Sequence, residues 1–201
     1  MLSKLLLMSS PDLSSLEKGV ASISAADDVH SVLQSLVRLA AEGARSSAAS
    51  LYMLDASGSL LKPYILHGLP EAYVRGCGDV LVGTQCCGRA VQHRRPWIVS
   101  DMLSDPLFAD ARVAVENSEI RAAFSVPVTD AADKCLGSLA CHYNRPYTPS
   151  SYDVERNRVF ATLIAFTIAK YGAPVVERGF AAQAATPDKN LRKVTPFSQP
   201  G

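Results

Sequence analysis

The stretch LVGTQCCGRAVQHRRPWIVSDMLSDP, residues 81–106, determines how the rest of the chain is interpreted. It places two adjacent cysteines, Cys86 and Cys87, directly before a glycine, followed by a short helical pattern and by PWIVSD, a strand preceded by proline. Such a pair could be a redox couple, metal ligands, a catalytic nucleophile, or two small residues packed where a loop enters a helix. The choice among these roles separates an enzyme from a sensor.

The segments on either side of this stretch alternate between helices and hairpins. A helix is predicted from Asp27 or Asp28 to about residue 42, because apolar residues recur there with helical spacing behind a capping aspartate. Hairpins are predicted at 48–68 and 121–144, and a long helix begins near Ser150. Hairpins with helices grouped around them favour an antiparallel α+β domain over a doubly wound parallel sheet.

These elements divide the chain into three parts. Residues 1–26 are rich in serine and leucine and form an N-terminal lead-in segment with a short helix. Residues 27–172 form one domain with a single core, which a chain of 201 residues can bury. Residues 173–201 contain four prolines and little apolar periodicity, so we expect a flexible C-terminal tail.

Composition and charge exclude several classes of function. The net charge of +1 lacks the basic excess of nucleic-acid-binding proteins, so no nucleic-acid partner is expected. The N-terminal apolar run is far shorter than the roughly 7–15 residues of a secretory signal. The longest apolar segment, 159–169, is well short of the roughly 20 residues that span a bilayer. We therefore expect a cytoplasmic protein without membrane insertion, whose five cysteines are reduced thiols.

Several pieces of the chain, taken in order, resemble the GAF domain, a small-molecule sensory module of signalling proteins. The pieces are ASLYMLD (49–55), HGLPEAYV (67–74), CGRAVQHRRPWIVSDMLSDPLFAD (87–110), IRAAFSVPV (120–128) and LGSLACHYNRPYTPSSYDVE (136–155). The resemblance implies a six-stranded antiparallel sheet with the terminal helices on one face. On the other face it implies a ligand pocket walled by the short helices and loops of 69–120. GAF domains bind cyclic nucleotides, haem, bilins, metabolites and ions, so the resemblance leaves the ligand and any cofactor unknown.

The adjacent cysteines are best interpreted as packing residues. A disulfide between them is disfavoured because neighbouring Cα atoms lie about 3.8 Å apart, below the usual range for a bridge. A metal site built from Cys77, Cys86, Cys87 and His93 has a spacing that matches no zinc motif. Cys87-Gly88 instead fits a tight connection from a loop into a helix, where the small thiol packs and the glycine permits close approach. Oxidation sensing by Cys77 or Cys86 is an alternative role.

An enzyme is one alternative. Free methionine-R-sulfoxide reductase, an enzyme branch of the GAF family, also carries Cys-Gly at this point, which suggests a thiol-dependent reductase that uses Cys87. That branch has a second essential cysteine in the loop that corresponds to PLFADARV, and this chain has none there. Without this second cysteine the chain lacks a thiol that catalysis in that branch requires, so a binding module is favoured over an enzyme.

The candidate ligand-binding residues lie mainly in the central part of the chain. They are Cys87, Trp97, Asp101, Phe108, Arg121, Phe124 and Ser125. The aromatic members could line a pocket and the polar members could anchor a ligand, although the same residue types also serve as ordinary core and turn caps. His67, His93 and His142 have no second ligand at a metal-binding spacing. Cys141-His142 lies in the last strand, whereas bilin-binding GAF domains carry their Cys-His pair in a helix.

These observations predict a sensory or regulatory domain that binds a small molecule and signals through its terminal helices. The partner is a separate effector protein or a second copy, and a ligand-free dimerisation scaffold is a further alternative. The helix 151–171 is apolar over more of its circumference than one sheet face covers. We therefore expect a parallel homodimer with Leu163 or Phe166 near the two-fold axis, or else coverage by residues 1–26.

Overall fold

The fold is organised around a six-stranded antiparallel sheet, seen in a computed structural model that describes residues 10–25, 28–109 and 111–172. The strand order is β3-β2-β1-β6-β5-β4, so β1 and β6 are central. The strands are β1 (Ala48–Leu54), β2 (Leu60–His67), β3 (Val80–Leu81), β4 (Trp97–Val99), β5 (Ala122–Thr129) and β6 (Cys135–Tyr143). The predicted α+β class and six-stranded sheet are confirmed.

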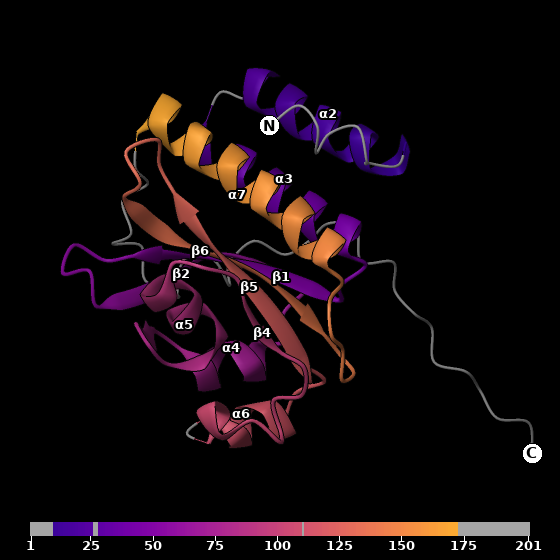
Figure 1. Cartoon of the computed structure of the whole chain (residues 1–201), viewed down its shortest axis with the longest axis vertical. Coiled ribbons are helices and arrows are strands. Elements are labelled where there is room, and N and C mark those ends of the chain that lie inside the picture. The colour runs from indigo at the N-terminus through magenta and orange to yellow at the C-terminus, as the bar shows by residue number, and fades with distance from the viewer. Residues whose placement is uncertain (1–9, 26–27, 110, 173–201) are drawn as a thin grey trace, which may run out of the picture.

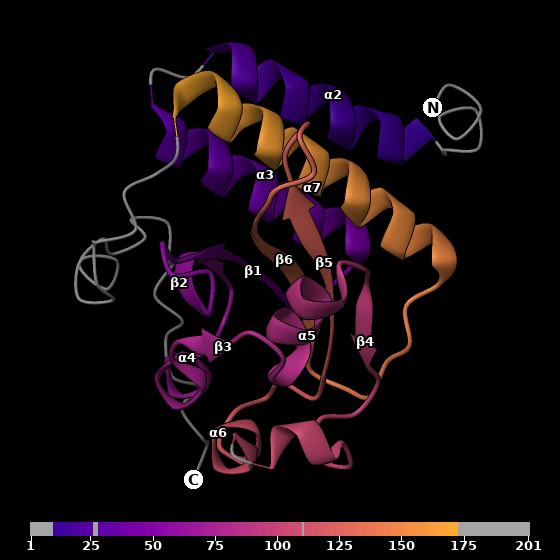
Figure 2. The same cartoon turned by 60° about the vertical axis from the view of Figure 1, so that its left-hand side comes forward.

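The helices form two groups on opposite faces of the sheet (Figures 1 and 2). One face is covered by α2 (Ser10–Ala25), α3 (Val29–Ala44) and α7 (Ser151–Tyr171). The other carries α4 (Glu71–Cys77), α5 (Gln85–His93), the 3-10 helix η1 (Pro106–Phe108) and α6 (Arg112–Glu116). The main apolar core fills the space between the sheet and the first group.

Local capping determines where the long helices begin. The Asp28 carboxylate accepts a hydrogen bond from the Ser31 backbone N–H at 2.9 Å, as the sequence predicts for the start of α3. Ser150 and Asp153 form a reciprocal capping box at the start of α7. The pattern GRAVQHRR, 88–95, predicts a helix that begins at Gly88, whereas α5 begins at Gln85, so the adjacent cysteines lie in its first turn. The pattern ADARVAVENSEI, 109–120, also predicts a helix, but α6 is shorter because turns occupy both of its ends.

The lead-in segment packs onto the domain. Leu16 and Ile23 of α2 are buried in the main core, and α2 contacts both α3 and α7. At Gly19, an added Cβ would lie 3.1 Å from Leu36 Cδ2 and 3.4 Å from Leu163 Cδ1. Helix α2 therefore covers the Leu163 side of α7.

Two further predictions concern the C-terminal tail and membrane insertion. The predicted tail, 173–201, lies outside the described residues. In the parts of the chain that the structure describes, no helix has the length and hydrophobicity needed to cross a membrane.

Candidate functional site

A row of buried polar side chains lies on the sheet face that points away from the terminal helices. Its members, Ser50, Ser125, Ser138 and His142, come from the adjacent strands β1, β5 and β6. Alternate residues of a strand share a face, which places Ser138 and His142 together along β6. The Ser50 hydroxyl lies 2.9 Å from His142 Nε2, and the Ser125 hydroxyl bonds to that of Ser138. We call these four residues the polar row.

His142 is the least satisfied member of the polar row. Its side chain is 3% exposed, and this burial lowers the pKa of the imidazole to about 4, so the ring is neutral near pH 7. Nδ1 is buried and has no hydrogen-bond partner among the described residues. If Nε2 carries the proton and donates to the Ser50 hydroxyl, Nδ1 is an acceptor; if Nε2 accepts from Ser50, Nδ1 carries the proton and is a donor. A buried polar atom of this kind offers a hydrogen bond to a ligand or to water.

Tyr73 of α4 covers His142. The two rings meet edge to face, with centroids 5.6 Å apart, and the tyrosine is 4% exposed. The Tyr73 hydroxyl contacts two sulfur groups, Met102 Sδ at 3.8 Å and the Cys77 thiol, and both are weak hydrogen-bond partners. Its burial raises the pKa of this phenol, so it stays protonated. The contact between α4 and the polar row is therefore poorly hydrogen-bonded on both sides.

Cys87 packs against the polar row from α5. It belongs to a small apolar cluster that includes Tyr52 and Ala140, and its thiol lies beside the Ser125 and Ser138 hydroxyls. The glycine after it lets α5 lie close to the backbone of 81–83, since a Cβ at Gly88 would overlap the carbonyl oxygen of Leu81 and lie 3.1 Å from Gly83 N. The close approach expected for Cys87-Gly88 is thus present, within the first turn of a helix.

The thiols near the site are held in the protonated form. Burial raises the pKa of Cys77 to about 11 and raises the pKa values of Cys86 and Cys87. The Cys86 thiol also donates to the carbonyl oxygen of Trp97 at 3.4 Å. Among the described residues, no three His, Cys, Asp or Glu side chains are grouped so that they could hold a metal ion. Cys77 and Cys86 are packed in one apolar cluster and Cys87 in another.

The other predicted site residues occupy three different places. Phe108 is buried in an apolar cluster with Tyr73 and Met102, and Trp97 is half-buried at the margin of that cluster. Asp101 and Arg121 form a two-pronged ion pair, with oxygen–nitrogen distances of 2.9 and 3.0 Å. This pair joins the loop after β4 to the start of β5, so both charges are already matched.

Phe124, the remaining candidate ligand-binding residue, lies in the main core, which is the packing role that the sequence left open. Phe124 follows Ala123 and precedes Ser125 on β5, and adjacent residues of a strand point to opposite faces. Its ring is fully buried in the main core between the sheet and the terminal helices, where it stacks with Tyr143. Phe124 therefore cannot line a ligand site on the face that carries Ser125.

Four residues of the site were missed as candidates from the sequence: Ser50, Tyr73, Ser138 and His142. Alternation along β6 placed Ser138 and His142 on one face, which was an available signal. The partnership of Ser50 with His142 joins residues 92 positions apart and leaves no local pattern. Tyr73 lies on a short helix whose docking depends on the rest of the fold.

The six-stranded sheet with a group of helices on each face defines an α+β fold. The GAF domain model matches residues 28–168, which is most of the chain, and the chain belongs to the GAF domain family. Membership supports a sensory or regulatory module. A search of curated proteins gave no match.

Similar solved structures include GAF domains from two bacterial phosphotransferases and one reductase. The GAF domain of Acinetobacter phosphoenolpyruvate-protein phosphotransferase is 18% identical, with a TM-score of 0.66, over 81% of this chain and 96% of that one. The GAF domain of the Coxiella burnetii phosphoenolpyruvate-protein phosphotransferase is 18% identical, with a TM-score of 0.68, over 79% of this chain and 93% of that one. Free methionine-R-sulfoxide reductase from Neisseria meningitidis, in complex with its substrate, is 17% identical, with a TM-score of 0.65, over 81% of this chain and 92% of that one. At these identities the likeness concerns the fold alone.

Proposed function

We propose that this chain is a cytoplasmic sensory domain that binds a small, uncharged polar molecule at the polar row. The observation that carries the proposal is the buried Nδ1 of His142, which has no hydrogen-bond partner among the described residues and lies in a row of hydroxyl groups. The polar row has no charged side chain, and its histidine is neutral. A charged ligand group would be buried there without a counter-charge, which is costly.

The terminal helices are in direct contact with the strands that carry the polar row. Cys141, next to His142, points to the opposite face, where its thiol donates to Asn157 Oδ1 of α7 at 3.6 Å. The Tyr143 hydroxyl donates to the carbonyl oxygen of Ala44 in α3 at 3.1 Å. A ligand that shifts β6 at His142 would therefore act on both α3 and α7, and through them on a separate effector or a second copy.

A thermal-shift screen tests the binding proposal. We expect a compound from a library of neutral polar metabolites to raise the melting temperature, since a ligand at 100 times its Kd stabilises the native state by about 2.7 kcal/mol. His142→Leu should abolish the shift because it removes the ring nitrogens. His67→Leu, the same change at a half-buried strand position, should keep it. An equal shift in both variants would place the ligand elsewhere, and no hit at all would favour the ligand-free scaffold.

The thiols argue against the reductase alternative. A thiol acts as a nucleophile through its thiolate, and burial raises the pKa of Cys87 above its ordinary value. In the described part of the segment that follows β4, 100–121, no cysteine is available as a second thiol. Cys87 therefore has a packing role in this proposal.

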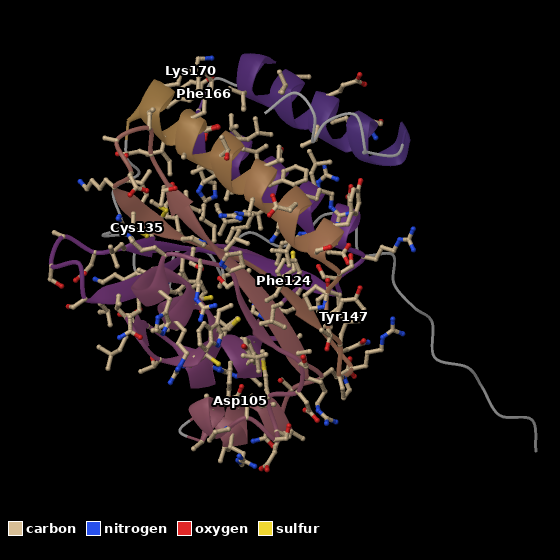
Figure 3. All side chains as sticks on the ribbon, viewed as in Figure 1. Asp105, Phe124, Cys135, Tyr147, Phe166 and Lys170 are labelled. Atoms are coloured by element: carbon tan, nitrogen blue, oxygen red, sulfur yellow. The ribbon has the colours of Figure 1, made fainter. Side chains whose placement is uncertain are left out.

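We also propose a homodimer through α7. Tyr152, Val159 and Phe166 recur every seven residues on this helix, the spacing of a seam between paired helices. Val159 is 38% exposed and Phe166 is 59% exposed. Figure 3 shows Phe166 beside Lys170 at the C-terminal end of α7. Because α2 covers Leu163, Phe166 is the residue that we place near the two-fold axis. A second copy brings an identical stripe, which suits such pairing.

Sedimentation equilibrium tests the dimer. Phe166→Glu should give a folded monomer, because a two-fold interface places the new charge in the seam twice. Val113→Glu alters an apolar residue that is 68% exposed on α6 and should leave the dimer intact. A wild-type chain that is monomeric at high micromolar concentration would show that this stripe does not pair.

A further inference from the structure

The one tryptophan of the chain lies within a group of basic side chains at the edge of the sheet. The His93 ring stacks on the Trp97 ring, with centroids 5.0 Å apart and planes inclined by 15°. The guanidinium carbons of Arg89 and Arg95 each lie 5.3 Å from the Trp97 ring centroid. We call these four residues the tryptophan patch. It shares no residue with the polar row, although Trp97 pairs with Ser125 across β4 and β5.

Positive charge in the tryptophan patch is not matched by carboxylates. Within the described residues, neither the Arg89 nor the Arg95 guanidinium forms a hydrogen bond or an ion pair, whereas the neighbouring Arg94 pairs with Asp133 at 3.1 Å. Nε of Arg89 is buried without an acceptor. A buried guanidinium N–H that lacks an acceptor costs free energy, and an oxyanion would supply that acceptor.

The backbone holds the tryptophan patch in place. Helix α5 ends at His93, and Arg94 takes a left-handed conformation, with φ of 50°, from which its N–H bonds to the carbonyl oxygens of Ala90 and Val91. Pro96 restricts the next step, and Trp97 then enters β4, where it pairs with Ser125. All four side chains thus project from one short, hydrogen-bonded segment, so little conformational entropy is lost when a ligand binds.

We propose that the tryptophan patch binds the phosphate group of a phosphate monoester. Arginine forks match phosphate and carboxylate geometry, and a phosphate brings more negative charge and more acceptor oxygens to a site with several cationic groups. The near-parallel His93 ring and the two guanidinium groups already occupy the surroundings of the Trp97 ring, so stacking on a nucleobase is disfavoured. The overall charge of +1 also disfavours a nucleic-acid polyanion.

Fluorescence of Trp97 in the full chain tests the proposal, because no other tryptophan contributes. Inorganic phosphate is added at constant ionic strength, with sodium chloride in the reference titration. We expect a saturable change with phosphate, and an apparent Kd that rises about tenfold or more in Arg89→Gln and in Arg95→Gln. Arg158→Gln alters an exposed arginine of α7 that pairs with Glu155, and should leave the Kd unchanged.

Further arms identify the source of the phosphate. Glycerol 3-phosphate represents a small metabolite, and a phosphoserine peptide represents a modified protein. The compound with the lower apparent Kd identifies which of the two carries the phosphate group. Glutamate that binds more tightly than phosphate would contradict the ligand class. A change that does not saturate, or that sodium chloride reproduces, would contradict the site itself. Arg95 is exposed, so Arg95→Gln remains a valid test even if Arg89→Gln fails to fold.

Discussion

Gly137→Ala is expected to lower the free energy of unfolding by about 3 kcal/mol or more. A Cβ at Gly137 would overlap the carbonyl oxygen of Tyr52 and lie 3.1 Å from the Cα of Met53. Both neighbours are backbone atoms of β1, and β1 and β6 form the central pair of the sheet. Neither strand can retreat, because β5 holds β6 on its other side, where Val128 pairs with Gly137. Urea denaturation measures the loss.

Gly19→Ala is the matched control for this change. The added Cβ would meet only the ends of the Leu36 and Leu163 side chains at first contact, at 3.1 and 3.4 Å, and these can rotate away. Alanine also favours the helix by about 1 kcal/mol over glycine, so the net change should be small. If Gly137→Ala were as stable as Gly19→Ala, the close approach of β1 and β6 would be wrong.

Acid should destabilise the protein through His142. Burial lowers the pKa of His142 from its ordinary value of 6.5 to about 4. Between these pH values the unfolded chain binds a proton at this residue and the folded chain does not, so the free energy of unfolding falls as the pH falls. Full stability is present above pH 6.5, and the loss accumulates down to about pH 4, where it reaches about 3 kcal/mol.

Comparison with His142→Gln isolates this contribution. Glutamine keeps a polar group beside Ser50 but does not titrate, and the carboxylates of the chain titrate alike in both proteins. Between pH 7 and pH 4 the wild type should lose about 3 kcal/mol more than the variant in urea denaturation. Parallel losses in the two proteins would mean that the folded state accepts the proton, and hence that His142 is not enclosed.

The helix starts and the α+β class were predictable because the signals are local. Asp28 and the Ser150–Asp153 capping box act within one helical turn, and apolar spacing reports the buried face of each helix. The order of the predicted elements and the short motifs along the chain were together sufficient to identify the GAF family. The start of α5 was placed too late: Thr84, a residue type common at helix starts, is its N-cap, and Gly88 lies inside the helix instead of at its entry.

The candidate site was only partly predictable. Cys87 and Ser125 were selected from the sequence, and the structure brings them together. Phe124 was selected with Ser125 although strand alternation separates their faces, so the pattern itself indicated that the two do not share a face. Asp101 and Arg121 were selected separately, and the fold pairs them across 20 positions of sequence.

The sequence by itself determined the family, the fold class and the starts of the capped helices. The signals for these are capping residues, apolar spacing and short motifs in order, which all lie within a few positions of one another along the chain. Only the tertiary structure decided that His142 lies beside Ser50 under Tyr73 and that α2 covers Leu163. Those outcomes depend on strand register and on the packing of segments far apart in the chain. A polar atom such as Nδ1 of His142 finds its partner, or lacks one, only when those segments meet.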